Sequence, residues 1–241
     1  MAAIAPKGAP TMVAMEDYAL KLYGMTGSGN CYKPALLMRQ LDLPFDWVEV
    51  STLKGETRTP EFLARNPNGK VPLLEITDGG EARTLAESNA MLCYLAEGTA
   101  FMPEDRWPRA QVMQWLFFEQ YSHEPYVATV RFWVHYLHKQ DEWKDKIAEA
   151  MKKGYAALAV MEQQLAKTPF LAGAAYTVAD IALYAYTHVA HQGGYSLERY
   201  PAIRQWLARV EREPRFVPMM QAAPRAPPWT TIGSPCLHAV R

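Results

Sequence analysis

The sequence predicts an α/β domain over residues 18–98 followed by an all-helical domain over residues 104–221. Two apolar runs with a helical pattern between them, and two further runs on either side of a turn at 78–80, indicate the first domain. The end of all strand signals beyond Pro103 indicates the second. Prolines recur in residues 1–17 and 222–241, so we expect both tails to be irregular.

The first domain is expected to follow the order βαβαββα. A helix separates the first two strands, which should therefore run parallel, whereas the Asp78-Gly79-Gly80 turn joins the last two as a hairpin. The expected strands are residues 18–23, 45–50, 71–76 and 83–85, and the expected helices are residues 32–41, 60–65 and 88–97.

Four helical patterns make up the second domain, at residues 105–137, 142–165, 179–191 and 203–212. Pro125 lies inside the first pattern and predicts a kink, because proline lacks an N–H and its ring clashes with the preceding turn. Thr177 and Asp180 have the spacing of a capping box before the third helix, with Asp in place of Glu. After Pro214 the density of prolines predicts no regular structure.

The charge balance favours a small-molecule partner over nucleic acid or a membrane. The 25 Lys and Arg residues equal the 25 Asp and Glu residues, and no run of like charge stands out. Residues 1–17 lack the continuous apolar stretch of a signal peptide, and no later run is long enough to span a bilayer. With 49% hydrophobic and 21% charged residues, the composition is that of a globular protein, and we expect a cytoplasmic location.

The cysteines and histidines favour neither a disulfide framework nor a metal site. Cys31, Cys93 and Cys236 are odd in number and widely spaced, without a CxxC pair, which fits a reducing compartment. Two histidine pairs are spaced three residues apart on helices without a third ligand, so we expect packing or surface roles for His135 and His138 and for His188 and His191. No bound metal is expected.

Two segments carry candidate binding groups. Pro72 follows Val71 at the head of an apolar run, and because proline cannot donate a ladder hydrogen bond, a strand start or edge is expected that leaves the N–H and C=O of Val71 to a ligand. Glu87 and Ser88 precede a helix, where the backbone N–H groups and the serine suit a carboxylate and Glu87 suits an ammonium. A simple capping serine is the alternative.

A third segment, the loop of residues 24–31, runs into a helix start, which favours an anion. Ser28, Asn30 and Cys31 are its polar candidates. A glycine-rich turn with a capping residue is the alternative.

The order of these segments resembles that of cytosolic glutathione S-transferases. Strand, serine-containing loop, helix and strand precede Asn66-Pro67-Asn68-Gly69-Lys70-Val71-Pro72, then Glu87-Ser88, then a helical domain with Thr177-Val178-Ala179-Asp180. The resemblance covers residues 18–220 and implies a thioredoxin-like N-terminal domain, an all-helical glutathione transferase C-terminal domain and a homodimer. It implies glutathione as co-substrate and no bound cofactor.

The resemblance places glutathione along the first two segments, its cysteinyl backbone paired with Val71 as an added strand and its γ-glutamyl head at Glu87 and Ser88. For the glycyl carboxylate we rank Lys70 above Lys54. The residues expected to contact glutathione are Lys54, Lys70, Val71, Pro72, Glu87 and Ser88.

The loop resembles the serine-type, theta-like arrangement, which makes Ser28 the expected activator of the glutathione thiol. Lowering a thiol pKa from about 8.5 to about 6.5 requires ~2.7 kcal/mol, and one hydrogen bond to a charged group contributes about 1.5–3 kcal/mol. We therefore expect the Asn30 amide or a helix N–H to share the task. Cys31 is the candidate for redox chemistry, through a mixed disulfide with glutathione, and a buried unreactive cysteine is the commoner alternative.

The second substrate is expected between the Ser28 loop and the aromatic segment of residues 115–123, lined by Phe118, Tyr121 and Arg131. The leading hypothesis is conjugation of the glutathione thiolate to a small hydrophobic electrophile. Glutathione-dependent reduction of disulfides or peroxides is the second, because some bacterial members without an activating tyrosine reduce disulfides with two glutathiones. A non-catalytic module that binds glutathione, another ligand or a protein is the third.

Overall fold

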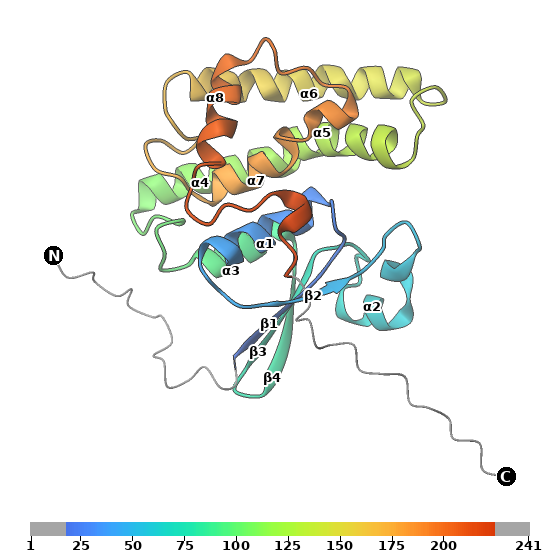
Figure 1. Ribbon diagram of the computed structural model, residues 1–241, viewed down its shortest axis with the longest axis vertical. Coiled ribbons are helices and arrows are strands. Elements are labelled where there is room, and N and C mark those ends of the chain that lie inside the picture. Colours follow the sequence, from blue (N-terminus) through green and yellow to red (C-terminus); the bar gives the residue numbers. More distant parts are fainter. Residues whose placement is uncertain (1–17, 225–241) are drawn as a thin grey trace.

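A computed structural model describes residues 18–224, with a four-stranded sheet below a layer of helices (Figure 1). The strands are β1 (Ala19–Gly24), β2 (Asp46–Glu49), β3 (Leu73–Asp78) and β4 (Glu81–Ala86), paired in the order β2-β1-β3-β4. Strands β1 and β2 are parallel, and β3 and β4 form an antiparallel hairpin, as the sequence predicts. Strand β3 also pairs antiparallel with β1, so the two units share one sheet.

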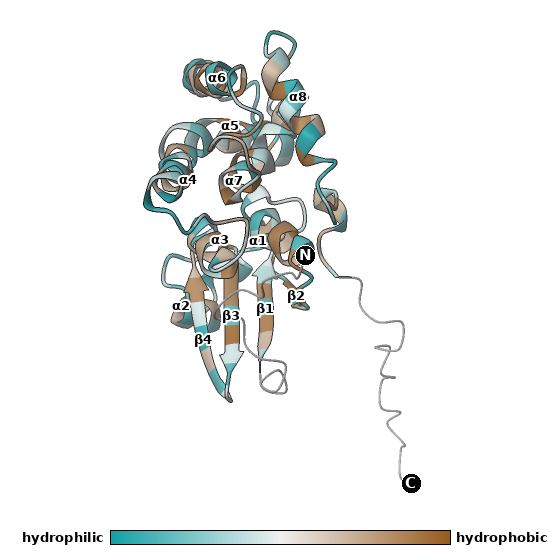
Figure 2. Ribbon diagram, turned by 90° about the vertical axis from the view of Figure 1, so that its left-hand side faces the viewer, coloured by the Kyte–Doolittle hydropathy of each residue, from teal (hydrophilic) through white to brown (hydrophobic). Residues whose placement is uncertain are grey.

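Helices α1 (Gly29–Gln40) and α3 (Ser88–Ala96) lie between the sheet and the helical layer (Figure 2). Helix α2 (Pro60–Arg65) covers the opposite side, where Phe62 packs with Val50 and Leu73 in a small separate cluster. Helix α1 starts three residues earlier than predicted, because Ser28 caps it. It is buried on nearly every side, as expected of a helix between two layers.

The upper layer contains α4 (Arg106–Phe118), α5 (Glu124–Arg131), α6 (Lys144–Leu165), α7 (Val178–Thr187) and α8 (Pro201–Val210). The single helix predicted over 105–137 is interrupted by two π-helical turns, Glu119–His123 and Phe132–Tyr136. Pro125 stands in the first turn of α5, where its missing N–H removes no bond that the helix needs. The interruption expected at this proline therefore takes the form of a π turn rather than a bend within one helix.

The capping box predicted at the start of the third C-terminal helix is present in α7. Asp180 is fully buried and accepts hydrogen bonds from the backbone and hydroxyl of Thr177, from the Leu171 N–H and from the indole of Trp206. Helix α7 ends at Thr187, four residues earlier than predicted, and a 3-10 turn follows at Ala190–Gly193.

Two further 3-10 turns complete the part of the chain that the structure describes. Short 3-10 turns occur at Glu56–Arg58 and, within the segment expected to be irregular, at Met219–Gln221. The predicted tails at 1–17 and, from residue 225, at the C-terminus lie outside the described residues. The domain bounds 18–98 and 104–221 stay predictions.

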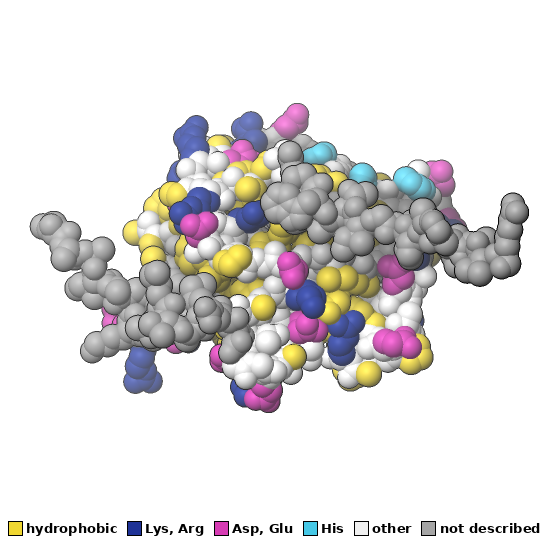
Figure 3. Space-filling view, turned by 60° about the horizontal axis from the view of Figure 1, so that its bottom comes forward, with side chains coloured by type: hydrophobic (Ala, Val, Ile, Leu, Met, Phe, Trp, Pro, Cys, Tyr) yellow, Lys and Arg dark blue, Asp and Glu magenta, His cyan; other side chains and the backbone are white. Residues whose placement is uncertain are grey.

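On the face seen from the sheet end, the described residues show no strong bias of charge. Among the described side chains visible there, lysine and arginine are interspersed with aspartate and glutamate, and neither sign forms a continuous patch (Figure 3). No helix within residues 18–224 combines the length and the apolar character needed to cross a membrane.

Candidate active site

The Val71–Pro72 peptide bond is cis, and β3 begins directly after it at Leu73. Neither the N–H nor the C=O of Val71 bonds to another backbone group within residues 18–224. The Asn66 side chain holds the backbone that leads into Val71, because its Nδ2 donates to the Lys70 carbonyl at 2.8 Å. An unpaired backbone N–H and C=O at a strand head is the feature required to pair with an extended peptide.

A small hollow of about 60 Å³ opens beside Val71. Glu87 has a φ of 67°, which is rare for a residue other than glycine, and Ser88 is the first residue of α3. Strained backbone of this kind clusters at ligand-binding positions. The hollow is lined by Asn30, Asn66, Lys70, Val71, Pro72, Glu87, Ser88, Gln120 and Glu124.

Ser88 does not act as the simple capping residue that the sequence left open. Its hydroxyl donates to Asn30 Oδ1 at 3.3 Å and accepts from Lys33 Nζ at 3.3 Å. The residue in the capping position is Glu87, whose side chain makes no capping bond. The Ser88 hydroxyl is thus oriented by a network of polar side chains on the floor of the small hollow.

Lys33 is the centre of that network and was not found by sequence reasoning. It is fully buried, with its Nζ 2.8 Å from Glu119 Oε1 and 3.9 Å from Glu124 Oε2. Glu119 also accepts from the amides of Asn89 and Gln120. The available signal was a lysine inside the apolar run of residues 31–38, where a solvated side chain does not fit.

A larger cavity of about 470 Å³ lies on the other side of Val71 and reaches the Ser28 loop. Cationic, hydroxyl and apolar side chains all face it, with Glu124 as its one carboxylate among the described residues. It is lined by Met25, Ser28, Thr52, Thr57, Arg58, Gly69, Lys70, Val71, Glu124, Ala128, Thr129, Arg131, Phe132, Tyr136 and Tyr186.

The Ser28 loop is held in place from both sides. Glu49 accepts hydrogen bonds of 2.8 Å from the Thr26 N–H and from the Thr26 hydroxyl. The Gly27 carbonyl accepts from Arg131 Nη1 at 3.0 Å and from the Tyr136 hydroxyl at 3.1 Å. These bonds fix the Gly27 carbonyl, which precedes Ser28 in the chain. They thereby hold the Ser28 loop at the N-terminus of α1.

The structure separates the three polar candidates of this loop. Ser28 lines the large cavity, but Asn30 lines the small hollow instead, where its amide bridges Ser88 and Glu124. Its Nδ2 donates to Glu124 Oε1 at 2.7 Å. Both ends of the amide are thus engaged within the hollow, and the predicted sharing of thiol activation by the Asn30 amide stays a prediction that this geometry does not favour.

For Cys31 the structure favours the alternative of a buried, unreactive cysteine over a redox role. The side chain is fully buried beneath the loop, and its Sγ accepts from the Met25 N–H at 3.3 Å. Burial raises the pKa of this thiol to about 11, against smaller opposing effects of hydrogen bonds from Ser28 and Met25. A protonated and inaccessible thiol does not exchange with a disulfide.

Of the two lysines, Lys70 lines both the hollow and the cavity, whereas Lys54 lines neither and is exposed on its loop. Arg58 lines the large cavity, which sequence reasoning did not anticipate. Nothing in its sequence surroundings distinguished it from ordinary surface charge.

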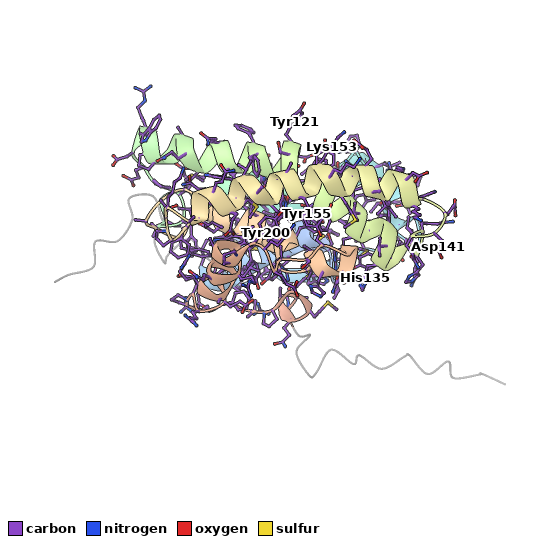
Figure 4. The ribbon with its side chains drawn as sticks, turned by 90° about the horizontal axis from the view of Figure 1, so that it is seen from above. Tyr121, His135, Asp141, Lys153, Tyr155 and Tyr200 are labelled. Carbon is purple, nitrogen blue, oxygen red and sulfur yellow. The ribbon has the colours of Figure 1, made fainter. Side chains whose placement is uncertain are left out.

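Of the three residues expected in the acceptor pocket, only Arg131 lines the large cavity. Phe118 faces a separate groove between α4 and α6, and Tyr121 is 84% exposed and points away from the helical layer (Figure 4). The reason is helical register, because the inward stripe of this segment follows the helical repeat and leaves both aromatics off it. The stripe consists of Val112, Trp115, Leu116, Glu119 and His123.

Comparison with known proteins agrees with this architecture. Residues 22–100 match the family model of the glutathione S-transferase N-terminal domain, and residues 130–209 match that of the C-terminal domain. The disulfide-bond oxidoreductase YfcG of Escherichia coli is 30% identical over 190 residues, which cover 77% of this chain and 87% of that protein. The chain belongs to the glutathione S-transferase family. Its fold is therefore the thioredoxin-like domain followed by the helical domain of that family.

Two solved structures extend the comparison. A glutathione S-transferase from Pseudomonas fluorescens is 52% identical with a TM-score of 0.80, covering 83% of this chain and 98% of that one. A glutathione transferase from Burkholderia graminis, with two glutathione molecules bound per subunit, is 25% identical with a TM-score of 0.75, covering 86% of this chain and 90% of that one.

Within residues 18–224, no group of three or more His, Cys, Asp and Glu side chains is arranged to hold a metal ion.

Proposed function

We propose that the chain binds glutathione across Val71 and transfers its thiolate to a small electrophile in the large cavity. The observation that carries this proposal is that Val71 lines both the small hollow and the cavity that Ser28 lines. An extended tripeptide paired with the free backbone groups of Val71 would have its head in the hollow and its sulfur toward Ser28.

The charges of the hollow suit the γ-glutamyl head. Glu87 and Glu124 supply two carboxylates for its ammonium, one from each domain. The Ser88 hydroxyl and the N-terminus of α3 suit its carboxylate. At the other end Lys70 and Arg58 are the cations available to the glycyl carboxylate. Lys54 plays no part in this arrangement.

The chemistry follows from the position of Ser28. Its hydroxyl donates a hydrogen bond to the sulfur and favours the thiolate, which is the nucleophile. The thiolate attacks the electrophilic carbon, a carbon–sulfur bond forms, and the leaving group departs with its electron pair. Met25, Ala128 and Phe132 provide an apolar wall for the electrophile.

The test is turnover with glutathione and a chloronitroarene, followed as appearance of the conjugate. We expect activity in the wild type and a loss of roughly tenfold or more in Ser28→Ala, because one charge-assisted hydrogen bond is worth about 1.5–3 kcal/mol. Glutathione binding should persist in the variant, since Val71 and the hollow are unchanged. Glutathione binding without turnover of any substrate would favour the non-catalytic module.

Disulfide reduction is the second candidate, and the charge of Arg131 favours it. The side chain is only 4% exposed, and no carboxylate among residues 18–224 lies within 4 Å of its guanidinium. A buried cation without a counter-ion is costly, and an anionic substrate such as a glutathione mixed disulfide would relieve that cost. Turnover of a small disulfide in excess of conjugation would make this the principal activity.

We also propose that the chain forms a homodimer. Trp107, Phe117 and Tyr121 are 73%, 66% and 84% exposed on the helical layer, and Tyr94 on α3 is 48% exposed. Exposed large aromatic side chains of this kind are candidates for the surface that a second subunit would cover. Sedimentation equilibrium should give twice the chain mass, and a monomer at micromolar concentration would contradict the proposal.

A further inference from the structure

A buried ion pair, called here the interdomain pair, joins the two domains next to the small hollow. It consists of Lys33, on α1 of the N-terminal domain, and Glu119, in the π turn that follows α4 of the helical domain. Lys33 Nζ is 2.8 Å from Glu119 Oε1, and neither side chain has any solvent exposure. Replacing a buried ion pair by apolar side chains of similar volume is often neutral or stabilising, so stability alone does not explain why a pair stands here.

The interdomain pair reaches the hollow through hydrogen bonds at both of its ends. Lys33 Nζ donates to Ser88 Oγ at 3.3 Å. Glu119 Oε2 accepts from the Gln120 amide at 2.8 Å, and the same amide donates to Glu124 Oε2 at 2.6 Å. Ser88, Gln120 and Glu124 line the hollow, whereas Lys33 and Glu119 do not. The pair can therefore act on a ligand only through the residues that it holds.

These bonds give the hollow two chemically different ends. At one end the cationic Lys33 donates to the Ser88 oxygen, which favours an anion as the partner of the serine proton. That proton is directed at Asn30 Oδ1, 3.3 Å away, which is long for a hydroxyl donor, so a carboxylate is the stronger acceptor.

At the other end stands a carboxylate that Lys33 does not neutralise. Lys33 Nζ lies 2.8 Å from Glu119 but 3.9 Å from Glu124, so Glu119 is its principal counter-ion. The Glu124 side chain is 22% exposed and is held by the Gln120 amide at the hollow. Its charge therefore suits an ammonium group.

We propose that the interdomain pair sets the polarity of the hollow. An α-amino acid head group is then accepted in one orientation, with its carboxylate at Ser88 and its ammonium at Glu124. Lys33 and Glu119 are positioning residues for this head group. The inference rests on the proposed function, in which the γ-glutamyl head of glutathione enters the hollow, and it adds that the packing of the two domains builds in the preference for that head.

The test uses the double variant Lys33→Met/Glu119→Met, which removes one positive and one negative charge and so leaves the net charge unchanged. Binding of two ligands is compared by calorimetry. One is glutathione, and the other is γ-aminobutyryl-cysteinylglycine, which lacks only the α-carboxylate of the head group. The matched control is Glu97→Met/Arg109→Met, because Arg109 Nη2 lies 2.7 Å from Glu97 Oε2 in another ion pair between the two domains, and neither residue lines the hollow.

We expect the wild type to bind glutathione at least about tenfold more tightly than the analogue, because the analogue loses a charge-assisted hydrogen bond. In Lys33→Met/Glu119→Met this ratio of affinities should fall to about threefold or less, with urea unfolding showing a folded protein. The control variant should keep the wild-type ratio. Ser88→Ala should lower the ratio to a similar value, and adding it to the double variant should change the ratio no further, because the pair acts through Ser88.

A wild-type ratio in Lys33→Met/Glu119→Met would overturn the inference, since a purely structural role weakens both ligands by the same factor. A double variant that does not fold would overturn it as well, because the pair would then serve the fold, and so would an equal fall of the ratio in the control. If only Ser88→Ala lowers the ratio, the inference fails and the proposed function stands. If the wild type does not bind glutathione, or binds it no more tightly than the analogue, the proposed function fails.

Discussion

Lys33 is the most informative single residue to replace, because its buried ion pair supports both the fold and the small hollow. Its Nζ lies 2.8 Å from Glu119 Oε1, and both side chains have no solvent exposure. The same nitrogen donates to Ser88 Oγ at 3.3 Å and to Asn89 Oδ1 at 3.4 Å. Lys33→Met keeps most of the aliphatic stem and removes only the charge and these three donations.

The expected cost follows from the charge left behind. Removing one partner of a buried ion pair destabilises a protein by about 3–5 kcal/mol, since the other charge stays buried without a counter-ion. At about 2–4 °C per kcal/mol for a chain of this size, the midpoint of thermal unfolding should fall by roughly 6–20 °C. The Ser88 hydroxyl also loses a donor, so the affinity for glutathione should fall.

The assay is urea unfolding of the wild type, of Lys33→Met and of the double variant Lys33→Met/Glu119→Met. Replacing both charges by apolar groups of similar size is often nearly neutral, so the double variant should be more stable than Lys33→Met by about 2 kcal/mol or more. The control is Arg83→Met, which breaks a surface pair with Glu81 and should barely move the midpoint. A loss below about 1 kcal/mol in Lys33→Met, or a double variant less stable than the single one, would refute the reasoning.

Three further variants or measurements test separate parts of the site. Gly29→Ala should lower the free energy of unfolding by about 1–3 kcal/mol, because its Cβ would lie 2.7 Å from the Tyr186 ring; a fully stable variant would show that this contact is absent. Burial raises the pKa of Cys31 to about 11, so its thiol is protonated at neutral pH. Iodoacetamide at pH 8 should therefore leave Cys31 unmodified in the folded protein. Rapid alkylation of Cys31, found by peptide mapping, would contradict its burial. Arg131→Met should raise the KM of an acceptor that bears a carboxylate about tenfold more than the KM of a neutral acceptor, which corresponds to about 1.4 kcal/mol of binding free energy. Equal changes in the two KM values would show that Arg131 does not pair with the substrate.

Much of the fold could be predicted from local patterns in the sequence. A helix between the first two apolar runs predicted parallel strands, and β1 and β2 are parallel. Thr177 and Asp180 predicted a capping box that α7 contains. These features depend on residues close together in the chain, where spacing and turn chemistry decide the outcome.

The π turns could not be predicted in this way. A π turn inserts a residue into a helix whose apolar pattern continues on both sides, so Glu119–His123 reads as ordinary helix. The same limitation explains Phe118 and Tyr121, since an aromatic-rich segment does not reveal which of its residues turns inward. Phe118 instead faces another groove, and Tyr121 faces solvent.

The site was predictable where it depended on backbone and not where it depended on distant side chains. Val71 and Ser88 were found from a proline and a helix start, and the structure brings them to one hollow. Lys33 and Tyr186 were missed, because their partners lie 86 and 156 positions away. A lysine or tyrosine inside a helical pattern is normally a surface or core residue. Only the packing of the two domains brings such a side chain next to the residues of the site.

A crystal structure with glutathione bound tests the central claim most directly. The account predicts the tripeptide backbone paired with the N–H and C=O of Val71, and the sulfur within hydrogen-bonding distance of Ser28 Oγ in the large cavity. A sulfur nearer to Asn30 or Cys31 than to Ser28, or a tripeptide that does not pair with Val71, would contradict it.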